Sequence, residues 1–505
     1  MKKTLILSCL SILSVVVRAQ SATDSLYFYA SSKAKIKTVG LGIPQLLNSS
    51  INKSTQVGLT YNYKKGGLKQ AQEAESQKKI IFNAEGISEV NKFKLYGYFN
   101  FERSNEDSLA FSQKGIHDDF SPYYFVVGKP GKFEKQGYNG GGLISYNLVK
   151  DKLFIGTGVD YQYHTSHRSV DPRSSVYTYQ LNFAPEISYK FNHHYIGLGV
   201  LYGYGNERIN VFYKNRDYQG TLLYPDRISY LNYGYGYLEI NQNNFIRKTS
   251  LSGLQLNYAA NFKSWEIAAR LKYSVKETEN KIEVQNSVQD QIFGSFQLEN
   301  IDFNFLITQQ NLTRLHQFGF NFINSYGDDN LRRLAARNFT YKFSALRAKY
   351  LYAPIVDGYK TYEFTVNADY FSNYKRDAAA NHTFDYSVLE PSISVGRYWK
   401  NTFRAQLGLG LMLPLSTNLK VPNTQVNMFT KGVAYADYMY LGSTLGKAEI
   451  AVEYLPKNLI PGFKSTIQFR ALFQNHLSSL NNNIVPTFAL GKQRLDFNVG
   501  YNLYF

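Results

Sequence analysis

Three short groups of residues have the types needed for acid–base or metal chemistry. Residues 117–119 (His-Asp-Asp), then His164, His167 and Asp171, and finally residues 328–330 (Asp-Asp-Asn) stand out. Histidine titrates near neutral pH and binds metals, and Asp and Asn oxygens suit hard cations. None of the groups has the spacing of a catalytic or metal site, and nothing after residue 330 completes an EF-hand. We therefore expect solvated loop side chains, no enzyme, and no catalytic, cofactor-binding or metal-binding residues.

Basic residues are numerous but dispersed. The 505-residue chain has 56 Lys and Arg against 38 Asp and Glu, a formal net charge of +18. In a soluble protein, a basic stripe or patch would point to nucleic-acid binding. Here the basic residues are spread along the whole chain, so we expect no nucleic-acid partner.

The last twelve residues indicate which kind of element positions these side chains. Side chains alternate between the two faces of a β-strand, so residues two apart share a face. One face of this segment is apolar throughout: Leu495, Phe497, Val499, Tyr501, Leu503 and Phe505. The segment resembles the terminal strand of a bacterial outer-membrane β-barrel. We expect Tyr501, Leu503 and Phe505 to form the assembly signal read by the barrel-insertion machinery.

The same alternation recurs along most of the chain. Short polar links lie near 149–152, 192–194, 263–264 and 400–402, and longer connections cover 104–132, 214–247, 326–337 and 415–441. Outer-membrane barrels have short periplasmic turns and long external loops. The sequence therefore predicts an all-β protein: a single transmembrane antiparallel β-barrel over residues 51–505, with about 18 strands and roughly 14 to 16 as alternatives.

Aromatic content fits the same fold. The chain contains 43 Tyr and 35 Phe but only 2 Trp, and aromatic girdles mark both membrane interfaces of such barrels. The alternation is weakest at 220–245 and 280–325. Residues 233–237 (Tyr-Gly-Tyr-Gly-Tyr) fit either a strand extension or an aromatic external loop.

The first 50 residues precede the predicted barrel. Two lysines followed by an apolar stretch from Leu5 to Val17 are typical of a secretory signal peptide, and the small residues near Ala19 predict cleavage after residue 19. The only cysteine, Cys9, lies in this segment, so the mature chain is expected to lack disulfides. Residues 20–50 are then either a small plug-like segment in the barrel mouth or a periplasmic tail on its rim.

Six basic residues fall on the polar faces of predicted strands and are therefore candidate lumen charges: Arg270, Lys272, Arg404, Lys464, Arg470 and Arg494. Two interpretations remain open. They are ordinary polar filling with cross-strand partners such as Glu266 and Asp496, or they line a path that favours anions.

The mature chain from Gln20 to Phe505 resembles a family of uncharacterised outer-membrane β-barrel proteins from Bacteroidota. The resemblance rests on the Ala19-Gln20 junction, the Tyr-rich strands, the large size without a receptor plug domain, and residues 501–505 at the end of the chain. It implies Sec-type export and a location in the bacterial outer membrane, in contact with lipid and lipopolysaccharide. It carries no catalytic motif.

Two functions are compatible with these features. The first is a passive or gated path for a small solute. The second is a non-conducting accessory or structural barrel that docks a receptor or surface lipoprotein through its loops, and an outer-membrane hydrolase is a remote third. A side-chain-filled lumen would favour the second function and a continuous aqueous lumen the first.

Overall fold

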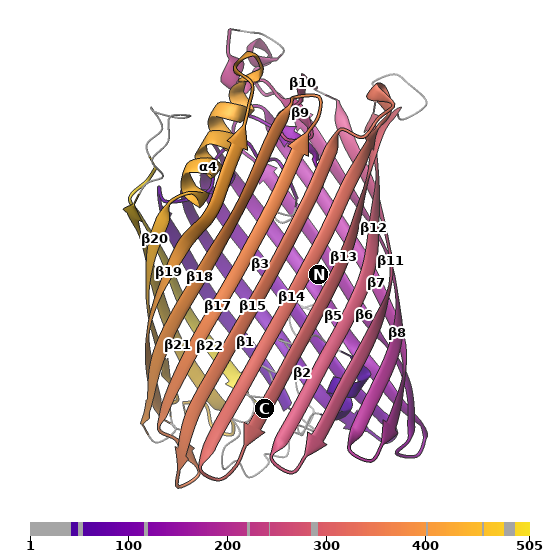
Figure 1. Ribbon diagram of the computed structural model, residues 1–505, viewed down its shortest axis with the longest axis vertical. Helices are drawn as coiled ribbons and strands as arrows, with labels where there is room; N and C mark the ends of the chain where they lie inside the picture. Colours follow the sequence, from indigo (N-terminus) through magenta and orange to yellow (C-terminus); the bar gives the residue numbers. More distant parts are fainter. Residues whose placement is uncertain are drawn as a thin grey trace, which may run out of the picture.

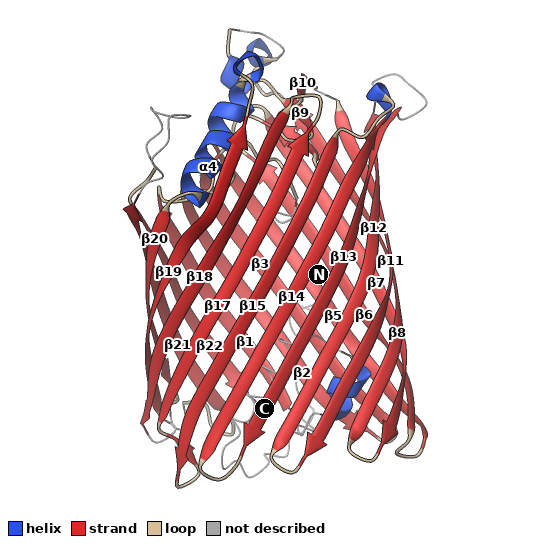
Figure 2. Ribbon diagram, viewed as in Figure 1, coloured by secondary structure: helices blue, strands red, loops and turns tan. Residues whose placement is uncertain are grey.

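The computed structural model describes residues 42–48, 54–115, 120–219, 223–241, 243–283, 291–399, 402–456, 459–478 and 490–504. It is a closed antiparallel β-barrel of 18 strands, which confirms the predicted fold class (Figures 1 and 2). The predicted signal peptide lies outside the described residues. Within them, no helix is long and apolar enough to cross a membrane.

The barrel strands follow one another around the wall in chain order. They are β1 (Ser54–Gly66), β2 (Ser76–Val90), β3 (Phe93–Leu109), β5 (Gly131–Val149), β6 (Leu153–Arg168), β7 (Arg173–Phe191), β8 (His194–Phe212), β11 (Asn244–Phe262), β12 (Trp265–Glu283), β13 (Gln291–Gln310), β14 (Arg314–Leu331), β15 (Phe339–Val356), β17 (Tyr362–Asp377), β18 (His382–Trp399), β19 (Phe403–Lys420), β20 (Thr444–Tyr454), β21 (Lys464–Ser478) and β22 (Gln493–Tyr504). The last strand, β22, pairs with β1 from Gln56↔Tyr504 to Gly66↔Arg494 and so closes the barrel.

Short elements lie between the strands. They are α3 (Ile43–Asn48), β4 (Tyr123–Val126), η2 (Arg216–Tyr218), η3 (Pro225–Arg227), β9 (Tyr230–Tyr233), β10 (Leu238–Ile240), η4 (Arg332–Leu334), β16 (Tyr359–Lys360), η5 (Asn423–Gln425), η6 (Thr430–Ala434) and α4 (Tyr435–Leu441). Strands β10, β9 and β4 form a separate three-stranded sheet.

The two ends of the barrel differ. At one end, which we call the short-turn end, strands are joined by tight turns such as those at Asn91, Asp151, Asn192 and Asp357. Each of these residues has a φ between 50° and 56°, a conformation that Asn and Asp tolerate better than most residues. At the other end, the loop end, long connections carry β4, β9, β10 and α4 (Figure 1).

Period-two alternation separates the two sides of the wall. Along β8, exposed and buried residues alternate from Ile196 to Gly205. The exposed side is apolar around the barrel, for example at Leu198, Val200, Leu254, Leu256, Val366, Ile393, Leu407 and Leu409. Exposed aromatic residues occur beside the short turns, including Tyr189, Phe191, Trp265, Tyr362 and Trp399. This is the arrangement that a membrane with two polar interfaces requires.

The rim at the loop end has a step. Pairing between β18 and β19 continues to Thr383↔Lys420, whereas pairing between β19 and β20 ends at Met412↔Leu445. Residues 413–420 of β19 therefore rise above β20 with no strand partner from β20. In Figure 1, α4 stands at this step, above the end of β20.

Candidate functional site

The loop end of the barrel is filled by its own connections, which together we call the plug. Four of them contribute through their described residues, which lie within 67–75, 110–130, 213–243 and 421–443. At its centre β4 pairs with β9, from Tyr123↔Tyr233 to Val126↔Tyr230. The sequence predicted long external loops here; the structure places their apolar parts inside the barrel mouth, because their aromatic side chains are buried there against the upper wall.

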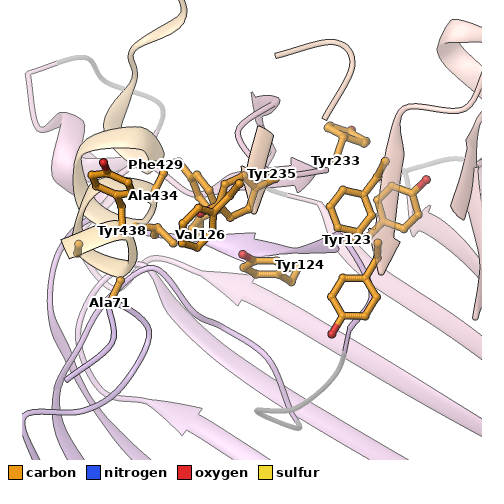
Figure 3. Packing of buried hydrophobic residues seen from close by; sticks show 14 of the residues in the cluster. Ala71, Tyr123, Tyr124, Val126, Tyr233, Tyr235, Phe429, Ala434 and Tyr438 are labelled. Atoms are coloured by element: carbon orange, nitrogen blue, oxygen red, sulfur yellow. The ribbon is translucent and has the colours of Figure 1, made fainter. Parts of the chain in front are cut away.

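Aromatic side chains make up much of the plug core (Figure 3). Tyr123 and Phe125 of β4 are 0% exposed. The ring of Tyr235 stacks on that of Phe384 from β18 at 5.9 Å and meets Phe429 edge-on at 5.4 Å. Apolar burial of this kind is the main favourable term in packing, so the plug is a folded element and not a set of solvated loops.

The turn at residues 233–237 is held by the neighbouring strand ends. Asp377, at the end of β17, accepts hydrogen bonds from the backbone N–H groups of Tyr235 at 2.7 Å, Tyr237 at 2.9 Å and Ala380 at 3.0 Å. His382 lies 2.9 Å from the Tyr235 carbonyl through Nδ1. Of the two predicted alternatives, the aromatic loop is correct, but the loop points inward.

Two polar contacts join β4 to the barrel wall. The hydroxyl of Tyr123 donates to Asp329 of β14 at 2.8 Å, and Asp329 also accepts the N–H of Phe339 at 2.7 Å. The Tyr123 carbonyl accepts from the guanidinium of Arg247. Arg247 is ion-paired with Glu207 at 3.1 Å, and both side chains are almost fully buried. Buried charges are stable only when ion pairs and hydrogen bonds satisfy them. Because Arg247 of the wall is satisfied in part by the Tyr123 carbonyl, the position of β4 depends on the wall.

Helix α4 joins the plug to the connection between β1 and β2. Its residue Asp437 accepts a hydrogen bond from the N–H of Ala71 at 2.9 Å. Gln72 donates to the Tyr124 hydroxyl at 2.9 Å and to the Phe111 carbonyl at 2.6 Å. Loss of surrounding water raises the pKa of Asp437 to about 6, although the Ala71 N–H and the cationic Lys375 act in the opposite direction.

The six candidate lumen charges all lie on the inner face of the wall, and most of them have acidic partners. Arg270 pairs with Asp302 at 3.0 Å, Arg404 with Glu363 at 2.7 Å, Arg470 with Glu449 at 2.7 Å, and Arg494 with Glu73 at 3.4 Å. Lys272 and Lys464 lie in the same inward rows of β12 and β21. Asp496, one of the expected partners, pairs with Lys64 at 3.4 Å. The structure therefore brings cations and anions together rather than forming one basic stripe.

The groups suspected of acid–base or metal chemistry do not form a site. His164 and His167 are three residues apart in β6, so their side chains point to opposite faces of the strand. Asp171 instead binds Arg173 at 3.1 Å and the N–H of Asn215 at 2.8 Å. Residues 117–119 lie outside the described residues. Among the described residues, no group of three or more His, Cys, Asp or Glu residues could hold a metal ion.

The second acidic run, at residues 328–330, has a structural role. Asp329 binds Tyr123, as described above, and Asp328 pairs with Arg337 at 3.1 Å. The neighbouring η4 turn exposes Arg332 and Arg333 at the loop end, and Arg333 pairs with Glu239 of β10. These carboxylates serve to fix the rim and are not arranged as cation ligands.

The short helix α3 lies inside the barrel near the short-turn end (Figure 2). Ile43 and Leu46 are fully buried against inward Leu143 and Phe154. The N–H of Ile43 donates to Glu186 at 3.2 Å, and Gln45 donates to the Ala269 carbonyl at 3.0 Å. Part of the segment 20–50 therefore packs on the inner wall; residues 20–41 and 49–50 lie outside the described residues.

The expected assembly signal sits at the closing seam. Tyr501 and Leu503 of β22 pair with Leu59 and Val57 of β1, respectively. Phe505 lies outside the described residues. The seam requires β22 for closure, while recognition by insertion machinery stays a prediction.

The fold and the plug together define a class: a transmembrane β-barrel whose mouth contains a folded plug made from its own connections. The chain belongs to a family of unknown function, DUF6850, whose profile matches residues 44–505. No curated protein matches the chain. The predicted link to Bacteroidota stays a prediction.

Several solved barrels are similar in structure. The ferric citrate transporter FecA in its unliganded form has a TM-score of 0.43 and 9% identity, covering 93% of this chain and 82% of that one. The copper transporter OprC has a TM-score of 0.41 and 7% identity, covering 90% and 81%. The siderophore receptor PiuA from Acinetobacter baumannii has a TM-score of 0.37 and 8% identity, covering 90% and 82%.

Proposed function

We propose that this protein is an outer-membrane barrel that provides a gated path for a small polar or charged solute. Its loop end faces the cell exterior and its short turns face the periplasm. Export by a Sec-type signal and insertion by the barrel-assembly machinery precede this function. Lipid and lipopolysaccharide contact the apolar outer wall.

The dimensions of the barrel support a path. Barrels of about 16 to 18 strands leave an aqueous channel unless something fills it, whereas about eight strands are filled by side chains alone. The inner wall is polar and hydrogen-bonded, as at Asn321, which donates to Asn304 at 2.9 Å. A polar lining inside an apolar outer surface is compatible with the passage of a polar solute.

The plug supports gating over passive flow. Its buried β4 and the stacked ring of Tyr235 lie in the mouth, which supports a path that opens when part of the plug moves. This is the observation on which the proposal depends. Ion pairs along the inner wall, such as Arg270 with Asp302, place both charge signs in the path. A modest anion preference therefore stays a proposal that depends on unpaired positive charge.

Conductance in planar bilayers tests the proposal. The intact protein should conduct rarely or weakly at low voltage. Replacing residues 111–129 with a short glycine-containing turn removes β4, and we expect this variant to show steady conductance. The matched control shortens the same end at residues 214–219, where η2 is exposed and outside the plug core. This control should behave as the intact protein does.

The accessory barrel is the second candidate, favoured by how tightly the plug is packed. If the variant without β4 folds but never conducts, the path is wrong. The better-supported function is then a non-conducting barrel that docks a receptor or surface lipoprotein. Co-purification of such a partner with the barrel from membranes becomes the relevant measurement. The exposed arginines of η4 are candidate contact points for such an anionic partner.

A further inference from the structure

Helix α4 occupies the one place where the described rim steps down. Residues 413–420 of β19 have no β20 partner, because β20 begins only at Thr444. The helix lies against this upper part of β19, where the Thr417 hydroxyl is 3.5 Å from the Leu441 carbonyl. Elsewhere around the barrel, each strand is held by ladders of backbone hydrogen bonds on both sides. Here the wall is completed by a helix, whose hydrogen bonds to Ala71 and Thr417 each join a side chain to a backbone group, so it can move without breaking a sheet.

One face of α4 belongs to the plug core. Met439 and Leu441 are buried in the main hydrophobic cluster, together with Val433 of η6. Asp437 lies on the same helix, half-buried, with its carboxylate on the N–H of Ala71. An ionised carboxylate that borders an apolar core is unfavourable unless cations and donors compensate for the lost water.

The compensation around Asp437 is incomplete. Lys375 of β17 and Lys69 of the β1–β2 connection favour the charged form, and Glu73 of the same connection opposes it. The remaining titratable groups that interact with it are phenols: Tyr124 from β4, Tyr235 from the β8–β11 connection, Tyr386 from β18, and Tyr440 on α4 itself. No ion pair within 4.0 Å involves Asp437 in the described part of the chain, although the Ala71 N–H remains a direct donor.

We propose, building on the gated path above, that α4 is the movable part of the gate and that ionisation of Asp437 promotes its release. The gate is then held shut at acidic pH and loosened at neutral pH.

The direction follows from proton linkage. In the closed arrangement, loss of surrounding water raises the pKa of Asp437 to about 6, well above its ordinary value. The closed state therefore binds the proton more tightly than an open state in which the carboxylate reaches water. Acidification stabilises the closed state, and a rise in pH through about 6 removes that stabilisation. Between pH 5 and 8 this shifts the opening equilibrium roughly ten-fold.

Cysteine labelling measures the motion directly. The chain has a single cysteine, Cys9, within the predicted signal peptide, so a cysteine placed in α4 gives a clean signal. Ala436 of α4 is 6% exposed, so an Ala436→Cys variant reacts with a hydrophilic maleimide only when the helix leaves the plug. Ala379→Cys, in the exposed turn between β17 and β18, serves as the reference. The ratio of the two rates cancels the intrinsic pH dependence of the thiol.

This ratio should rise roughly ten-fold from pH 5 to pH 8 in the otherwise unchanged protein. Adding Asp437→Asn, which keeps the shape and an acceptor oxygen but removes the charge, should flatten the profile and lower the ratio at pH 8 by roughly 100-fold. The control Asp217→Asn removes an exposed acid of η2 and should leave the profile unchanged. A ratio that does not change with pH, or an Asp437→Asn variant with the original profile, overturns the proposal.

The two proposals fail separately. If labelling responds to pH as described but the variant without β4 never conducts, α4 moves and the gated path is wrong. If that variant conducts but the labelling ratio changes neither with pH nor on substitution of Asp437, the gated path is supported and the proposed release of α4 is wrong. Heat-resistant migration of each variant on gels checks that its barrel is folded.

Discussion

Replacing Asp377 with Asn should loosen the aromatic turn at residues 233–237 without unfolding the barrel. The Asp377 carboxylate is fully buried and accepts three backbone N–H groups, two on Oδ2 and one on Oδ1. An amide of the same shape has one acceptor oxygen and one NH2 donor. In its better orientation it keeps Tyr235 and Tyr237, but it then presents a donor to the N–H of Ala380.

The magnitude follows from these contacts. A buried N–H left without an acceptor costs about 1–3 kcal/mol, and hydrogen bonds to a charged group are stronger than neutral ones by about 1 kcal/mol each. With the lost bond at the low end of its range, about 1 kcal/mol, and about 1 kcal/mol for each weakened bond, opening the turn becomes easier by about 3 kcal/mol. Since 1.4 kcal/mol is a factor of ten, the opening equilibrium should rise about 150-fold.

Hydrogen–deuterium exchange reports this local opening. Peptides covering residues 228–241 should exchange about 150-fold faster in the Asp377→Asn variant, because exchange follows local opening when closing is fast. The control Asp226→Asn alters an exposed acid in the same connection, which pairs with Lys129 at 3.4 Å, and should leave exchange unchanged. If these peptides exchange at the original rate in a folded Asp377→Asn barrel, the carboxylate does not hold the turn and our reasoning about the plug is wrong.

Three further outcomes are expected. Arg247→Met leaves Glu207 buried without its cation and should destabilise the closed plug by about 3–5 kcal/mol. The expected result is bilayer conductance from a protein that keeps all of its loops. In a conducting variant, combining Arg270→Glu with Arg404→Glu should reduce or reverse any anion preference in reversal-potential measurements, since each change alters the local charge by two units. Phe505→Asp should reduce heat-resistant folded barrel sharply while the exported chain remains detectable in the periplasm; normal folded levels would refute the assembly signal.

The barrel itself could be predicted because its signal is local and repeated. Each strand shows its lipid-facing side every second residue, so a one-residue error would expose polar groups to lipid. The short links near 192–194 and 263–264 were identified correctly because strands end there on both sides. Even the weak region 280–325 contains all of β13 and most of β14, which pair from Gly294↔Leu331 to Gln310↔Leu315.

The plug could not be predicted because its partners are distant in the sequence. Tyr123 meets Asp329 206 residues away, and Tyr235 meets Asp377 142 residues away. Neither contact produces a periodic pattern in the sequence. A usable signal existed nonetheless: Tyr123, Tyr124 and Phe125 in a row are too apolar for a solvated loop. His164 and His167 do not form a site because of the local secondary structure. A spacing of three brings side chains together on a helix but places them on opposite faces of a strand.

The parts of the plug depend on one another for their stability. No single connection buries enough apolar surface to fold alone: β4 has four residues, β10 has three and α4 has seven. Each is stable only against the others and against the upper wall, as with Tyr235 between Phe384 and Phe429. Because the parts stabilise one another, a disturbance at one contact reaches the rest, so a single half-buried carboxylate on α4 can govern the whole mouth.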